Sequence, residues 1–132
     1  MKTANRATRW PRLANPVLAA LRKPAVIGLS DVTMDLQAVQ AVNGLREGRL
    51  TMFEGRVLEA LVFITRKLAE QGIGPEALQC CERCQALLAV LKAGRTLQPD
   101  QVHAFDDLIG WNQAQRDADT EAYVAAALPF IR

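Results

Sequence analysis

Apolar residues recur along this chain every three to four positions, the spacing that places them on one face of an α-helix. Signals for strands are sparse, because β-branched residues form no alternating runs and the Asn43-Gly44 pair lies inside a helical pattern. The pattern therefore predicts an all-α fold. The predicted connections are about three to six residues long, so neighbouring helices should pack antiparallel in a compact bundle of four to five helices.

The first long helix is predicted to begin at a Ser30 or Asp31 cap and to end near Gly48. Before it, Asn15-Pro16 can cap a short turn, which Pro24 ends. The predicted stripe of the long helix consists of Val32, Leu36, Val39, Val42 and Arg46.

The second helix has a specific start signal. Thr51 and Glu54 have the spacing of a capping box, in which each side chain accepts a hydrogen bond from the other residue's free backbone amide. Gly72 should end the helix. One apolar face is expected to point into the core, with Phe53, Val57, Leu61, Ile64 and Leu68.

The remaining helices start at Gly74-Pro75, at Pro99 and at a Thr120 cap, and Gly94 should serve as the left-handed cap after the third helix. Trp111 is expected at the edge of the core. The third helix should bury Ala77, Cys81, Cys84, Leu88 and Leu91, and the fourth Val102, Phe105, Leu108, Ile109 and Asn112.

Charge is small in sum but uneven along the 132 residues, whose net charge is +2. The first carboxylate is Asp31, and residues 24–132 include ten basic and fourteen acidic side chains. The sequence thus predicts a basic, flexible arm over residues 1–14 and a single helical-bundle domain over 15–132. The basic side chains before position 24 are Lys2, Arg6, Arg9, Arg12, Arg22 and Lys23.

Such an arm can bind phosphate or an acidic protein face, and Trp10 beside Arg9 adds a ring that can stack on a base. It can equally be a solvated tail without a partner. As a targeting signal it is weak, because the apolar stretch 17–21 is short. No apolar run approaches the roughly 20 residues that span a bilayer, so we expect a cytoplasmic protein without a membrane partner.

Cys80, Cys81 and Cys84 form the one cysteine cluster, and the single histidine is His103. A structural zinc site takes four ligands, usually from two separated pairs, which this chain does not offer. The cysteines lie within a helical apolar stripe, so we expect free thiols in the core, and neither a metal nor a cofactor.

Catalytic chemistry is not indicated elsewhere in the sequence. His103 can pair with Asp107 four residues later, but on a polar face with no nucleophile nearby, so a solvated pair is expected. No phosphate-binding loop, dinucleotide motif or metal-binding helix motif occurs. We therefore expect no enzyme activity.

Phe63 is the unusual residue of the second helix, because it falls in the middle of the charged face. An aromatic ring at that place is either an anchor for a partner or a contact with another helix of the same domain. Both interpretations stay open from sequence. The candidate protein-binding residues are Phe63, Arg56, Arg66 and Lys67.

Several short segments together resemble a group of small proteobacterial proteins from plasmid-like or prophage-like regions, often labelled Fis-type transcriptional regulators. The segments that carry the resemblance are Asn15-Pro16-Val17, Asn43-Gly44-Leu45-Arg46-Glu47-Gly48, Leu68-Ala69, Gly72-Ile73-Gly74 and Ala114-Gln115-Arg116-Asp117-Ala118-Asp119-Thr120. The resemblance implies an all-helical accessory protein of mobile DNA.

Three functions follow as expectations. The first is a non-enzymatic regulator or inhibitor from a bacterial mobile element or phage that binds a host protein through the Phe63 face, the arm, or both. The second is a nucleic-acid-binding accessory or transcription factor that uses the arm. The third is a structural or assembly protein, for which self-association into a homo-oligomer is the main expectation.

Overall fold

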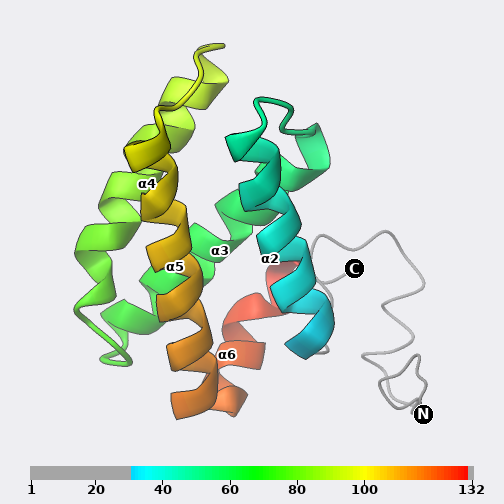
Figure 1. Cartoon of the computed structure of the whole chain (residues 1–132). Coiled ribbons are helices and arrows are strands. Elements are labelled where there is room, and N and C mark those ends of the chain that lie inside the picture. The colour runs from blue at the N-terminus through cyan, green and yellow to red at the C-terminus, as the bar shows by residue number, and fades with distance from the viewer. Residues whose placement is uncertain (1–30, 131–132) are drawn as a thin grey trace.

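The computed structural model describes residues 31–130, and the side chains from residue 34 onward. Over these residues it contains five α-helices, a terminal 3-10 turn and no strand, arranged as a compact bundle (Figure 1). The predicted all-α bundle is confirmed. The predicted arm and the short turn after Asn15-Pro16 lie outside the described residues. The elements are α2 (Asp31–Arg46), α3 (Met52–Glu70), α4 (Ala77–Lys92), α5 (Pro99–Ala118), α6 (Thr120–Ala127) and η1 (Leu128–Phe130).

Helix α3 is the centre of the bundle, because it packs against α2, α4, α5 and α6 (Figure 1). Of its predicted core face, Val57, Leu61, Ile64 and Leu68 are buried. Phe53 is 45% exposed, so its predicted burial is wrong. Phe53 and the exposed Met52 both belong to the first turn of α3.

Helix α2 turns a different face to the core than its large apolar residues predict. Leu36, Val39 and Arg46 are exposed, so the predicted stripe is wrong at these three positions; Val42 is buried, and the Val32 side chain is not among those described. A different stripe, of both small and large apolar residues, is buried instead, and Gly44 lies against the Glu54 side chain, where an added Cβ would be 2.6 Å from the Oε1 atom. The buried side chains of α2 include Met34, Ala38, Ala41, Val42 and Leu45.

Hydrogen bonds at the helix starts test the predicted caps. Thr51 Oγ1 accepts from the Glu54 amide at 3.1 Å, and Glu54 Oε1 accepts from the Thr51 amide at 3.0 Å, which confirms the capping box. The predicted Thr120 cap of α6 is wrong. Asp119 caps this helix by accepting from the Ala122 amide, because α5 extends to Ala118 and the Thr120 hydroxyl already donates to the Arg116 carbonyl of α5.

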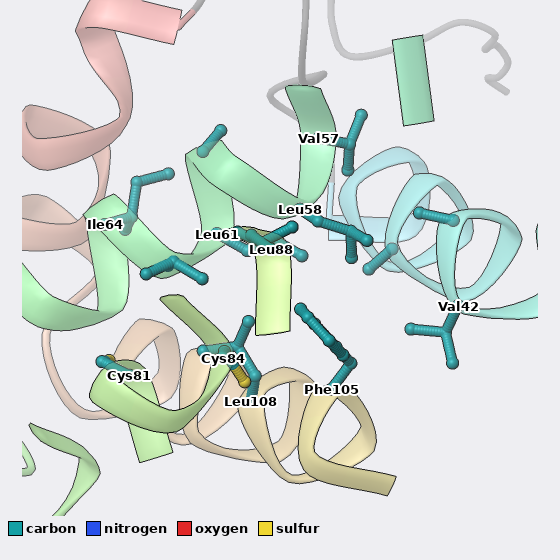
Figure 2. Close-up of a cluster of buried hydrophobic side chains, with 14 of the residues drawn as sticks. Val42, Val57, Leu58, Leu61, Ile64, Cys81, Cys84, Leu88, Phe105 and Leu108 are labelled. Atoms are coloured by element: carbon teal, nitrogen blue, oxygen red, sulfur yellow. The ribbon is translucent and has the colours of Figure 1, made fainter. Parts of the chain in front are cut away.

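The core between α3, α4 and α5 contains the cysteines, as Figure 2 shows. Cys81 and Cys84 are fully buried and Cys80 is partly buried, which confirms the predicted packing role; all three thiols are free. The Cys84 thiol donates a weak hydrogen bond to the Ala104 carbonyl at 3.3 Å. Of the predicted stripes, Leu91 and Ile109 are only partly buried, at the margin of this core.

Burial makes these thiols poor acids, and this predicts an alkaline limit to stability. Desolvation raises the pKa of Cys81 to about 11 and raises the pKa of Cys84 still further. A thiol whose pKa is higher in the folded chain favours folding below its unfolded pKa and ceases to do so as the pH rises through its folded pKa. The urea midpoint should therefore fall as the pH is raised above about 9.

A double variant, Cys81→Ala with Cys84→Ala, provides the control. Its midpoint at pH 8 will be lower than that of the parent, because two buried sulfur atoms are lost. Between pH 8 and 10.5 its midpoint should fall less than that of the parent. Equal declines in the two proteins would contradict the assignment of this pH dependence to the buried thiols.

Candidate functional site

A groove runs along the surface between α3 and α4. The two helices are antiparallel, as shown by the hydrogen bond from Arg66 to Gln85 at 2.7 Å and the ion pair between Lys92 and Glu59 at 2.5 Å. One part of the groove has a volume of about 310 Å³ and is lined by Glu59, Val62, Phe63, Arg66, Gln85, Leu88, Ala89 and Lys92. We refer to the whole depression as the α3–α4 groove.

The groove continues toward the start of α3. Its second part has a volume of about 430 Å³ and shares Glu59, Leu88 and Lys92 with the first part. The residues that line only this second part are Leu50, Thr51, Met52, Gly55, Arg56 and Leu91. The ion pair between Glu59 and Lys92 thus lies where the two parts meet.

Phe63 lies at the edge of the groove, and its surroundings bear on both interpretations drawn from the sequence. Its ring meets that of Phe130 edge-on, with the centroids 5.1 Å apart and the planes at 68°. Lys67 Nζ lies 5.9 Å from the centroid of the Phe63 ring. Despite these contacts Phe63 is 47% exposed, so the ring touches its own domain on one edge and solvent on the rest.

Some of the charged residues around Phe63 form an ion pair with a residue of opposite charge, and others do not. Glu59 is paired with Lys92, and Arg66 lies 3.5 Å from Glu70 while also donating to Gln85. Arg56 and Lys67 have no carboxylate partner among residues 31–130. Among the predicted protein-binding residues, Phe63, Arg56 and Arg66 line the groove, and Lys67 stands over the ring of Phe63.

The predicted catalytic and metal candidates lie elsewhere. His103 is 72% exposed, and its Nδ1 atom is 3.3 Å from Asp106 Oδ2, so the predicted pairing with Asp107 is wrong. Asp106 also accepts from Arg46, which orients its carboxylate toward His103 on the same helix. Within the described part of the chain, no group of three or more His, Cys, Asp or Glu side chains could hold a metal ion. None of the described helices is both long and apolar enough to cross a bilayer.

A buried polar network behind the groove was missed by the sequence analysis, apart from the inward position of Asn112. The Tyr123 hydroxyl donates to Asn112 Oδ1 at 2.7 Å, and Asn112 Nδ2 donates to Thr65 Oγ1 at 3.2 Å. Gln115 Nε2 donates to the Thr65 and Ile73 carbonyls. Burial raises the pKa of Tyr123 to about 12, so this hydroxyl is a donor at neutral pH. The network fixes α6 and α5 against the buried side of α3.

Asp35 and Arg116 extend this polar contact toward α2. Arg116 Nη2 lies 3.0 Å from Asp35 Oδ1, and the guanidinium carbon is 5.8 Å from the centroid of the Tyr123 ring. The Arg116 side chain is only 7% exposed. The ion pair thus joins α2 to α5, and the same guanidinium lies over the Tyr123 ring of α6.

The candidate arm residues lie outside the described residues; they are Lys2, Arg6, Arg9, Trp10, Arg12, Arg22 and Lys23. The chain matches no known protein family, no curated protein and no solved structure.

Proposed function

We propose that this protein is a non-enzymatic regulator that binds another protein through the α3–α4 groove. The observation that carries the proposal is Phe63, a large aromatic side chain that is 47% exposed at the edge of a groove. Val62 and Leu88 contribute apolar surface to the same groove. An aromatic side chain surrounded by apolar surface and a charged rim is typical of the centre of a protein interface.

The resemblance to helical proteins of plasmid-like and prophage-like regions supports a role in a bacterial mobile element or phage. A compact helical protein of such an element can act as a regulator or inhibitor by covering a functional surface of a host protein. We therefore propose a host protein or complex as the partner.

Site-specific photo-crosslinking tests this function. A photoreactive amino acid is placed at Ala89, which lines the groove and is exposed, or at Ala114, which is also exposed but lies on α5. After irradiation in bacterial cells, position 89 should give a discrete adduct with another protein, and Phe63→Ala should abolish it. Equal adducts from both positions, or none from position 89, would contradict the proposal, and an adduct with a second copy of the chain would favour the assembly function instead.

The alternative function, nucleic-acid binding through the arm, rests on the six basic and no acidic residues among positions 1–23. It predicts that the logarithm of affinity for DNA falls steeply with the logarithm of salt concentration. Residues 31–130 contain nine basic and fourteen acidic side chains, so binding should depend on the arm.

Deletion of residues 1–12 tests the arm separately from the fold. The stretch has almost no apolar periodicity and cannot contribute much core, so the melting temperature should move by less than about 5 °C, which corresponds to roughly 1 kcal/mol for a domain of this size. Differential scanning calorimetry measures this shift. A larger decrease would show that the arm is packed against the bundle.

A further inference from the structure

We infer that the occupant of the α3–α4 groove is an acidic amphipathic helix of the partner protein, with an apolar anchor between two carboxylates. This inference rests on the proposed function and names the chemistry of the partner segment. Three features of the groove carry it: its walls, its length and the positions of its uncompensated cations.

The walls of the groove favour a helix over an extended peptide. Apart from Leu50 and Thr51, which precede α3, the lining residues belong to two helices. The interior backbone amides and carbonyls of these helices are bonded within each helix, so the groove offers no strand edge. An occupant must then satisfy its own backbone groups, as a helix does. From Met52 to Arg66 the groove follows 15 residues of α3, a rise of about 21 Å, which matches a helix of about four turns.

The apolar part of the groove fixes where the anchor binds. Val62 and Leu88 are nearly buried and form part of the surface between the two helices beside the exposed ring of Phe63. An aliphatic or aromatic side chain of the partner placed here would remove the exposed part of Phe63 from water. The Glu59–Lys92 ion pair crosses the groove next to this point with both side chains exposed, so it can open at little cost when a partner binds.

The uncompensated cations fix the charge of the occupant. Arg56 lies two helical turns before Phe63 and Lys67 one turn after it, so the two cations are about 16 Å apart along the helix axis. Neither has a carboxylate partner among residues 31–130, whereas Glu59 and Arg66 are already paired. Carboxylates about eleven residues apart on the occupying helix would meet both cations.

A single-stranded nucleic acid is the competing occupant, since a ring flanked by cations can stack a base. The groove favours protein, because aliphatic side chains, among them Met52, Leu88 and Leu91, line it and are covered better by an apolar side chain than by a sugar-phosphate backbone. The competing occupant is therefore included in the test.

The test is a selection from a displayed library of 16-residue helical peptides on the full-length protein, with counter-selection on Phe63→Ala. Enriched peptides should carry a net negative charge, with an apolar anchor between carboxylates about eleven positions apart. By fluorescence anisotropy they should bind the Arg56→Glu, Lys67→Glu variant at least tenfold more weakly. A control with the same charge change outside the groove, Arg83→Glu with Arg95→Glu, should bind within about threefold of the parent. A labelled 16-nucleotide single-stranded DNA should show no binding that depends on Phe63.

The outcomes separate this inference from the proposed function. If enriched peptides depend on Phe63 but are neutral or basic, the groove binds protein and the acidic helix is wrong. If the control variant, Arg83→Glu with Arg95→Glu, weakens binding as much as the groove variant does, the assignment of the occupant's charge is wrong. If no peptide depends on Phe63, or the DNA binds in a Phe63-dependent way, the inference is overturned, while the crosslink from position 89 decides the proposed function separately.

Discussion

Replacing Asn112 by alanine is expected to lower the free energy of unfolding by about 3 kcal/mol. The substitution leaves two buried hydroxyl groups without a hydrogen-bond partner, and each such group costs about 1–3 kcal/mol. Its Oδ1 atom accepts from the Tyr123 hydroxyl at 2.7 Å and its Nδ2 atom donates to Thr65 Oγ1 at 3.2 Å. Thr65 and Tyr123 are fully buried, so water cannot replace the lost amide without entering the core. Equilibrium unfolding in urea, followed by circular dichroism, measures the change.

Two further variants separate lost hydrogen bonds from lost volume. Tyr123→Phe leaves Asn112 Oδ1 without its donor and also removes the hydrogen bond between the Tyr123 hydroxyl and Arg116. It should lower the unfolding free energy by about 1–2 kcal/mol. The triple variant Thr65→Val, Asn112→Leu, Tyr123→Phe leaves none of these side-chain polar atoms and should be more stable than Asn112→Ala. A loss below about 1 kcal/mol for Asn112→Ala would contradict the view that this network holds α6 to the bundle.

Replacing Phe63 by alanine is expected to weaken partner binding at least 30-fold, or about 2 kcal/mol, as truncation of a central aromatic side chain does. The ring is half exposed beside the apolar part of the groove, so a partner can bury the remaining surface. Single alanine substitutions at Arg56, Arg66 and Lys67 should have smaller effects, mainly on the association rate and its salt dependence. Surface plasmon resonance at two salt concentrations measures both rate constants.

The same Phe63 variant should remain folded with only a modest loss of stability. The lost contacts are chiefly the edge-on pair with Phe130 and the Lys67 cation over the ring, so the unfolding free energy should fall by about 1–1.5 kcal/mol. A fully buried ring would lose about 3–5 kcal/mol. A loss in that higher range would show that Phe63 serves the core of the bundle.

Structural features that depend on residues a few positions apart could be predicted from the sequence. Thr51 and Glu54 are three residues apart, so the start of α3 could be recognised without knowing any other part of the fold. The position of Phe63 on the charged face also follows from helix geometry alone. That position left open whether the ring anchors a partner or contacts another part of the domain; the ring is 47% exposed and also meets Phe130.

Properties set by packing between distant segments could not be predicted in the same way. Helix α2 carries apolar residues on more than one face, and its packing against α3 and α5 buries Leu45 with its neighbours on one face while Leu36 and Val39 stay exposed. The network from Thr65 to Asn112 joins residues 47 positions apart, and the groove beside Phe63 exists because α4 aligns Leu88 with Val62. Polar residues at inward helix positions, such as Asn112, were the one signal of this network in the sequence.

The comparison of Phe63→Ala with Phe130→Ala in one calorimetric titration tests the proposed interface most directly. Each variant removes one ring of the same pair, so both lose that contact, but only Phe63 lines the groove. Titrated with the protein crosslinked through position 89, Phe63→Ala should bind at least 30-fold more weakly than the parent, and Phe130→Ala within about threefold of it. Equal losses in the two variants, or no loss in either, would contradict a protein interface centred on Phe63.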